Sequence, residues 1–186
     1  MPDPDVRRIV LVGFMGSGKT TIGEALAAAL HWRFEDLDLH IQALDGRDIP
    51  TIFRDSGEAR FRAMEAEVGA RLLSRDGIVL ATGGGWAAAA GRLDALPPGT
   101  VSVWLRVSPE EAVRRAAAEP GARPLLADPD PLTAARRLLE RREPRYARAD
   151  FAVDTDGVTP ERVTNEVLAL VERGPAHHHL RQERDS

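Results

Sequence analysis

The stretch that decides the predicted fold is Gly13-Phe14-Met15-Gly16-Ser17-Gly18-Lys19-Thr20, near the start of a 186-residue chain. It matches the pattern G-x-x-x-x-G-K-[ST], a P-loop whose backbone N–H groups cradle phosphate oxygens. An apolar run, Ile9–Val12, precedes it, and a helical pattern, Thr20–Leu30, follows it. Because a P-loop requires this strand–loop–helix context, a nucleotide site is a much better interpretation than a structural glycine-rich turn.

The residue types of the loop predict how a nucleotide is held. Glycines let backbone N–H groups point inward, and the N-terminus of the following helix adds partial positive charge. Lys19 is expected to reach the β- and γ-phosphates, and the Thr20 hydroxyl to ligate Mg²⁺. We therefore predict ATP and Mg²⁺ as ligands, with nucleotide contacts from Met15, Gly16, Ser17, Gly18, Lys19, Thr20 and Thr21.

Beyond the P-loop, strand-like apolar runs alternate with helical patterns. The expected strands are Ile9–Val12, Arg33–Asp36, Ile78–Ala81, Val101–Leu105 and Phe151–Val153. The expected helices are Thr20–Leu30, Glu58–Leu73, Pro109–Ala118, Leu132–Arg142 and Pro160–Val171. This alternation is typical of βαβ units and a parallel sheet. The fold class that we predict is α/β, a three-layer P-loop NTPase fold around a five-stranded parallel sheet.

Length and composition indicate one domain and exclude several classes of protein. We expect residues 1–173 to form the domain, with a lid loop at about 119–131 that is rich in Pro, Gly and Asp, and a poorly ordered tail at 174–186. No apolar run approaches the roughly 20 residues of a membrane span. A net charge of −4 argues against nucleic acid as a partner, and the absence of cysteine excludes a thiol nucleophile. We expect a cytoplasmic protein, because no secretory signal pattern opens the chain. We also expect a monomer.

Two motifs follow the carboxyl ends of predicted strands, where ligands bind in open α/β sheets. Asp36-Leu37-Asp38 follows the second strand in a loop, and Thr82-Gly83-Gly84-Gly85 follows the third. One carboxylate of the pair could help to hold Mg²⁺ while the other accepts a hydrogen bond from a substrate hydroxyl. A turn pair and a tight structural turn are the competing interpretations.

Three arginines are candidates for binding anions. Arg123 lies in the predicted lid, where a guanidinium would neutralise charge on a transferring phosphoryl group. Arg142 lies in the run Arg141–Tyr146 at a helix end, and it could hold a carboxylate bidentately. Composition alone makes Arg62 a surface charge and places Glu65 on a helix face that points away from the core. It makes the cluster around Arg142 the basic last turn of a helix.

Taken in order, six segments resemble the successive signatures of shikimate kinases. They are GFMGSGKTTIG, FEDLDLHI, IPTIFRDSGEARFRAME, ATGGG, RPLL and the R-x-P-x-Y segment, and they span roughly Ile9–Tyr146. Their order and spacing are far more specific than any single motif. The resemblance implies a nucleoside-monophosphate-kinase-like domain with a lid, which phosphorylates the 3-hydroxyl of shikimate with ATP in aromatic amino acid biosynthesis.

The resemblance also implies roles for individual residues. Asp38 is implied as the substrate-binding catalytic base, Asp36 as part of the Mg²⁺ surroundings together with Thr20, and Lys19 and Arg123 as catalytic cations. The adenine is implied to lie between Arg115 and the loop around Pro160. The substrate site is implied to consist of Asp38, Arg62, Gly83, Gly84, Gly85 and Arg142.

Three residues depart from what the resemblance leads us to expect. Trp86 stands where a small residue is expected, Arg145 replaces a Leu, and Val158 stands in place of an arginine near the adenine. Trp86 either narrows the acceptor pocket or packs against the Ala-rich segment that follows it. Two other functions stay open at this point: a kinase of another polyol acid such as gluconate, and a non-catalytic nucleotide-binding module.

Overall fold

The computed structural model describes residues 2–118 and 128–174. Its centre is a five-stranded, entirely parallel sheet in the order β2-β3-β1-β4-β5. The strands are β1 (Arg8–Val12), β2 (Arg33–Asp36), β3 (Ile78–Ala81), β4 (Thr100–Arg106) and β5 (Phe151–Asp154). The predicted α/β class and five parallel strands are therefore confirmed, with strand ends displaced by one residue at most.

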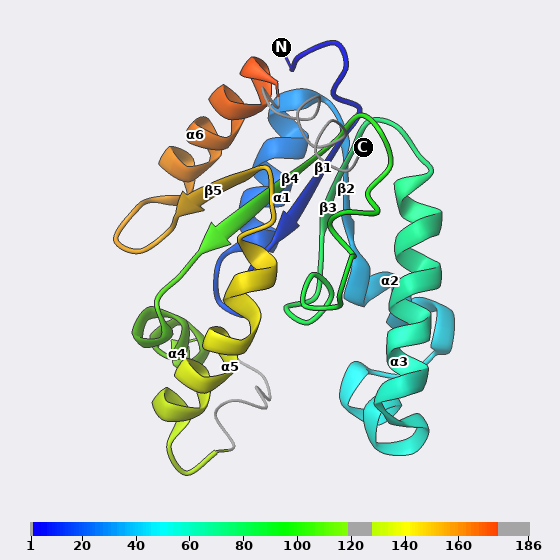
Figure 1. The fold of residues 1–186 in the computed structure, drawn as a ribbon, viewed down its shortest axis with the longest axis vertical. Coiled ribbons are helices and arrows are strands. Elements are labelled where there is room, and N and C mark those ends of the chain that lie inside the picture. Colours follow the sequence, from blue (N-terminus) through cyan, green and yellow to red (C-terminus); the bar gives the residue numbers. More distant parts are fainter. Residues whose placement is uncertain (1, 119–127, 175–186) are drawn as a thin grey trace, which may run out of the picture.

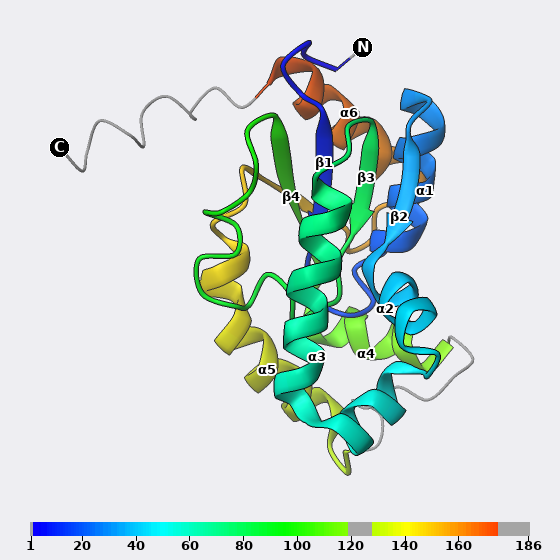
Figure 2. The same ribbon diagram turned by 90° about the vertical axis from the view of Figure 1, so that its right-hand side faces the viewer.

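Helices cover both faces of the sheet and make the expected three layers (Figure 1). They are α1 (Lys19–Leu30), α2 (Leu37–Asp45), α3 (Ile49–Leu73), α4 (Pro109–Ala118), α5 (Pro131–Tyr146) and α6 (Pro160–Arg173). Figure 2 shows α3 across one face of the sheet and α1 and α6 on the other. The buried apolar residues accordingly form two clusters, one on each side of the sheet.

Three helices differ from the sequence prediction. Helix α2 was not predicted, because its nine residues are short and follow β2 without a connecting loop. Helix α3 begins at Ile49 rather than Glu58, and non-helical backbone at Gly57 (φ 78°, ψ 167°) separates its two parts. Helix α5 continues past Arg142 to Tyr146 although Pro144 lies within it. Pro144 has no backbone N–H, so this last turn lacks the helical hydrogen bond that residue 144 would otherwise donate.

The strand order brings the chemical motifs together. Strands β2, β3 and β1 are neighbours, and the register pairs Asp36 with Ala81 and Ala81 with Leu11. The segments that follow these three strands therefore leave the sheet at one edge, as parallel strands require. These segments contain Asp38, the glycine triplet and the P-loop. No helix in the described part of the chain is long and apolar enough to span a membrane.

The predicted lid and tail fall largely outside the description. Residues 119–127, which include Arg123, lie outside the described residues, as do residues 175–186 of the predicted tail. The described end of the lid segment leads into α5, where the side chain of Asp130 accepts a hydrogen bond from the Thr133 N–H over 3.1 Å. Pro131, predicted as the last lid residue, is the first residue of α5.

Candidate active site

The P-loop needs glycine at the positions where its backbone turns. Gly16 and Gly18 adopt φ angles of 73° and 86°, which side-chain-bearing residues rarely adopt. A Cβ atom at Gly13 would lie 2.5 Å from the carbonyl oxygen of Leu105, so the loop also packs too closely to β4 for any side chain. Lys19 Nζ donates to the Gly13 carbonyl (3.0 Å) and to the Phe14 carbonyl (2.8 Å), which holds its ammonium group over the loop.

The D-x-D pair lies at the start of helix α2, not in a loop as predicted. Asp36 is the N-cap of α2, and its Oδ1 accepts hydrogen bonds from the backbone N–H groups of Asp38 (3.0 Å) and Leu39 (3.2 Å). This capping fixes the backbone of Asp38 in the first helical turn. The structural interpretation therefore applies to Asp36, and its place in the Mg²⁺ surroundings stays a prediction.

Asp38 is the carboxylate with the environment of a base. Its Oδ1 is buried and has no hydrogen-bond partner among the described residues. The pKa of Asp38 is raised to about 6, mainly by burial and then by the charges of Asp36 and Glu65, while Lys19 and Arg62 oppose that shift. A base with a pKa near the working pH is ionised at neutral pH and still able to take a proton.

Each glycine of the triplet faces a different polar side chain. A Cβ atom at Gly83 would lie 2.8 Å from Oδ1 of Asp38, and one at Gly85 would lie 2.7 Å from Arg62 Nη1. At Gly84 the added atom would lie 3.3 Å from Arg142 Nη1. The triplet therefore lies against all three side chains that were predicted to bind the acceptor.

The C-terminal turn of α5 fixes the middle of the triplet. Arg142 Nη1 donates to the Gly84 carbonyl over 3.1 Å, and the hydroxyl of buried Tyr146 donates to the same oxygen. Trp104 packs beside Tyr146 with ring centroids 5.9 Å apart. Arg142 belongs to the cluster that composition alone made a basic last turn. It thus contacts the glycine triplet.

Glu65 belongs to the site, although the sequence placed it on a non-core face. It is 1% exposed and pairs with Arg62 over 2.6 Å, while Glu58 accepts from Arg62 on the other side over 3.1 Å. Burial raises the pKa of Glu65, and the nearby arginines, Arg62 foremost, counteract that rise. The available signal was its spacing, because a residue three after Arg62 lies on the same helix face.

The side of the site that is predicted to hold the adenine is built around Arg115. Its guanidinium donates to the carbonyl oxygens of Gly16 (2.9 Å) and Thr155 (2.7 Å), and Nε pairs with Glu111 (2.7 Å). These bonds tie α4 to the P-loop and to the segment after β5. A cavity of about 420 Å³ lies here, and its lining includes Ser17, Arg115, Val158 and Pro160.

A second cavity, of about 440 Å³, adjoins the first and is lined by residues predicted to bind phosphate and acceptor. The two share Gly16, Gly18 and Thr21 in their linings. The second is lined by Met15, Gly16, Gly18, Lys19, Thr20, Thr21, Asp36, Asp38, Ala81, Thr82, Gly83 and Gly84. Apart from Arg123, the residues predicted for ATP and substrate thus line these cavities or contact the glycine triplet.

The donors present fit Mg²⁺ bound together with phosphate. The described residues contain no cluster of three or more His, Cys, Asp and Glu that could enclose a metal alone. Thr20 and Asp36 line the same cavity as Lys19. One hydroxyl and one carboxylate suit Mg²⁺, which usually keeps several waters and takes its other ligands from nucleotide phosphates.

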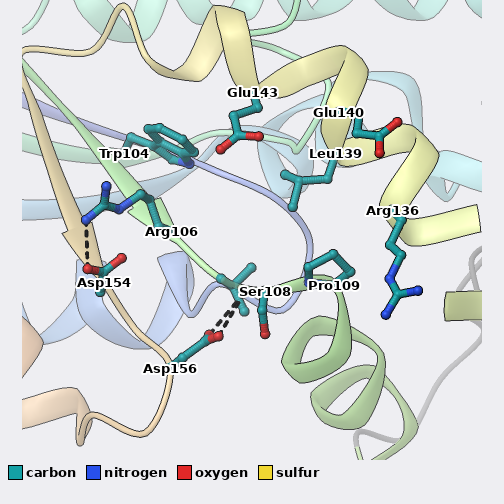
Figure 3. A pocket seen from close by; sticks show the side chains of 11 residues that line it. Trp104, Arg106, Ser108, Pro109, Arg136, Leu139, Glu140, Glu143, Asp154 and Asp156 are labelled. Carbon is teal, nitrogen blue, oxygen red and sulfur yellow. Dashed lines mark hydrogen bonds and ion pairs between the residues drawn. The ribbon is translucent and has the colours of Figure 1, made fainter. Parts of the chain in front are cut away.

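A cavity larger than these two lies apart from this site. Its volume is about 590 Å³, and it lies between α5 and the carboxyl ends of β4 and β5 (Figure 3). Figure 3 shows Arg106 paired with Asp154, and Asp156 accepting from the Ser108 N–H. None of the residues predicted for ATP or substrate lines it. Size alone therefore does not identify the functional site here.

A P-loop and an arginine-flanked acceptor pocket at one edge of a parallel sheet define a small-molecule kinase of the P-loop class. The family model described as shikimate kinase matches residues 15–172. The chain belongs to the shikimate kinase family.

Relatives and solved structures agree with this membership. The shikimate kinase of Salinispora arenicola is 49% identical over 87% of this chain and 96% of its own length. Shikimate kinase from Acinetobacter baumannii in complex with shikimate is 35% identical, with a TM-score of 0.81 over 89% of this chain and 93% of that chain. A gluconokinase from Sinorhizobium meliloti is 25% identical, with a TM-score of 0.62 over 92% of this chain and 94% of that chain. The likeness to shikimate kinases is therefore the stronger one.

Proposed function

We propose that this protein transfers the γ-phosphate of ATP to the 3-hydroxyl of shikimate, giving shikimate 3-phosphate and ADP. The observation that carries the proposal is the contact of each glycine in the triplet with a different predicted acceptor ligand, Asp38, Arg142 or Arg62. Family membership and the shikimate bound to the Acinetobacter baumannii relative support the choice of acceptor.

In the proposed acceptor site, the arginines bind the carboxylate of the substrate and Asp38 acts on its hydroxyl. Arg62 and Arg142 flank the triplet and suit a planar carboxylate, which guanidinium groups bind bidentately. Asp38 lines the cavity of the P-loop together with Lys19 and Gly83. An acid bound by its carboxylate between the arginines would thus direct a ring hydroxyl at Asp38 and the γ-phosphate.

In the proposed step, the 3-hydroxyl oxygen forms a bond to the γ-phosphorus while the bond from that phosphorus to the β,γ-bridging oxygen breaks. Asp38 receives the hydroxyl proton, and ADP keeps the electron pair of the broken bond. Lys19 neutralises charge on the phosphates, and Arg123 is proposed to share this role. Thr20 and Asp36 would hold Mg²⁺ together with the phosphates, and the ion would supply further neutralisation of phosphate charge. Positioning and electrostatics carry most of such a reaction because its transition state is loose.

The alternatives differ in which acceptor stimulates turnover. A coupled ADP-release assay with ATP and Mg²⁺ would compare shikimate, gluconate and no acceptor. The proposal predicts release that depends on shikimate and exceeds both other rates. Stimulation by gluconate alone would assign the other polyol-acid function, and no stimulation by either acid would favour a nucleotide-binding module. We further propose that the protein acts in the cytoplasm as a monomer.

A further inference from the structure

Trp86 is among the largest fully buried side chains of the described part of the chain, with 1% of its surface exposed. It follows the glycine triplet directly, and its backbone N–H donates to the Gly83 carbonyl over 3.0 Å. Its indole Nε1 is buried and has no hydrogen-bond partner among the described residues. Buried indole N–H groups usually have an acceptor, so close packing rather than hydrogen bonding must fix this ring.

The ring packs onto helix α3 at a position without a side chain. A Cβ atom at Gly69 would lie 3.1 Å from Nε1 of Trp86 and within 3.8 Å of two further ring atoms. Glycine inside a helix is unfavourable, so its presence at position 69 has a specific cause in this fit. Arg92 covers the ring as well, with Cζ 5.2 Å from the ring centroid. Trp86 is thus enclosed by α3 and Arg92.

The contact between Trp86 and Gly69 lies on the same face of α3 as Arg62. Arg62, Glu65 and Gly69 are spaced three and four residues apart, so they share one face of the helix. This face meets the triplet segment at two points: Arg62 against Gly85, and Gly69 against Trp86. The size of the side chain at position 86 therefore sets how far the triplet stands from α3.

We propose that Trp86 is a positioning residue: it fixes the separation between the glycine triplet and α3, and so places Arg62 to receive the carboxylate of the acceptor. The inference rests on the proposed function for the identity of the acceptor. Trp86 is buried, with 1% of its surface exposed, so it acts through the triplet and not by touching substrate. It packs on α3 at Gly69, a contact that the sequence did not predict.

The test uses a pair of variants that should compensate each other. Trp86→Phe replaces the indole with a smaller ring. Gly69→Ala adds a methyl group that crowds the Trp86 ring, although alanine also has a higher helix propensity in α3. Each single variant is expected to raise the KM for shikimate by roughly three- to tenfold through misplaced ligands, with the KM for ATP unchanged. The double variant should recover most of the loss, because the smaller ring makes room for the added methyl group. Trp32→Phe, on the other side of the sheet, is the control.

A second readout needs no acceptor. Trp86→Phe is expected to speed amide hydrogen exchange at residues 83–86 and to leave the P-loop amides unchanged. A merely structural role would instead lower the melting temperature and leave the KM for shikimate unchanged. If the unmodified protein turns over shikimate and both single variants keep its KM and its exchange rates, the role of Trp86 is overturned. If the unmodified protein shows no turnover with shikimate, the proposed function fails, while the exchange rates still decide whether Trp86 positions the triplet.

Discussion

Gly83 and Asp38 are so close that no side chain fits between them. A Cβ atom on Gly83 would lie 2.8 Å from Oδ1 of Asp38, which is closer than real Cβ atoms approach other heavy atoms. The same oxygen has no hydrogen-bond partner among the described residues. Because Gly83 has no side chain, there is room beside the carboxylate of Asp38. We expect a substrate hydroxyl to donate a hydrogen bond to Oδ1 there.

This closeness predicts that Gly83→Ala is far more damaging than Gly84→Ala. The methyl group at position 83 meets a short, half-buried carboxylate, whereas at position 84 it meets the movable end of Arg142 at 3.3 Å. We expect Gly83→Ala to lower kcat/KM for shikimate by about 100-fold, as misplacing a catalytic group does, and Gly84→Ala to lower it by about tenfold or less. Steady-state kinetics on both variants measures this, and equal losses would contradict the geometry.

Asp38→Asn is expected to remove turnover without removing the nucleotide site. Asparagine keeps the shape of the side chain but cannot take the hydroxyl proton, which typically costs about 10²–10⁴-fold in kcat. Binding of a non-hydrolysable ATP analogue, measured by calorimetry, should stay nearly intact. Asp55→Asn, at a partly exposed ion pair in α3, is the control. Turnover of the Asp38 variant at the unmodified rate would remove Asp38 from the catalytic role.

The raised pKa of Asp38 predicts a loss of activity on the acid side. Since burial raises this pKa to about 6, the carboxyl is protonated below that pH and cannot act as a base. In the unmodified protein, kcat/KM for shikimate should fall about tenfold per pH unit below pH ~6 and level off above it. A profile flat down to pH 5 would show that ionised Asp38 is not required. The residual activity of Asp38→Asn should lack this limb.

Arg142 is expected to bind the acceptor through its carboxylate. Arg142→Ala should raise the KM for shikimate by roughly 10- to 100-fold, which is the range of a charge-assisted bidentate pair. With the methyl ester of shikimate, which has no negative charge, the same substitution should have a much smaller effect. Arg145→Ala, at an exposed neighbour on α5, is the matched control. Equal losses with acid and ester would place the carboxylate elsewhere.

Arg115 is expected to affect the nucleotide and not the acceptor. Arg115→Gln removes the charged donor that holds the Gly16 and Thr155 carbonyls. We expect the KM for ATP to rise by roughly tenfold, as for the loss of hydrogen bonds to a charged group, and the KM for shikimate to stay within about twofold. Arg148→Gln, at an exposed ion pair with Asp94, is the control. A rise in the KM for shikimate of similar size would contradict separate subsites.

The sheet was predictable from sequence because buried parallel strands are short, apolar and bounded by clear breaks. Ile78–Ala81 and Phe151–Asp154 match or nearly match the expected runs. Helix α2 was missed because its sequence has no clear start signal. The Asp36 side chain caps its first turn, whereas a D-x-D sequence by itself is typical of a loop. The start of α3 was missed because Gly57 interrupts it.

For the site, motifs identified which residues meet, but not how they are held. The spacing of the P-loop and of the triplet was enough to predict that Lys19, Asp38 and Gly83 would line one cavity. Sequence could not predict that Glu65 is buried against Arg62, because an isolated acidic residue in a helix is normally solvated. The fit of Trp86 against Gly69 likewise depends on how α3 crosses the sheet, which no local pattern contains.

The central claim is the transfer of phosphate to one particular hydroxyl of shikimate. Phosphorus NMR of a reaction with ATP, Mg²⁺ and shikimate tests it directly, because coupling between the ester phosphorus and a ring proton identifies the esterified carbon. We predict a new phosphate monoester coupled to the proton on carbon 3, formed in step with ADP and formed far more slowly by Asp38→Asn. Formation of ADP and inorganic phosphate alone, or of an ester at another carbon, would contradict the account.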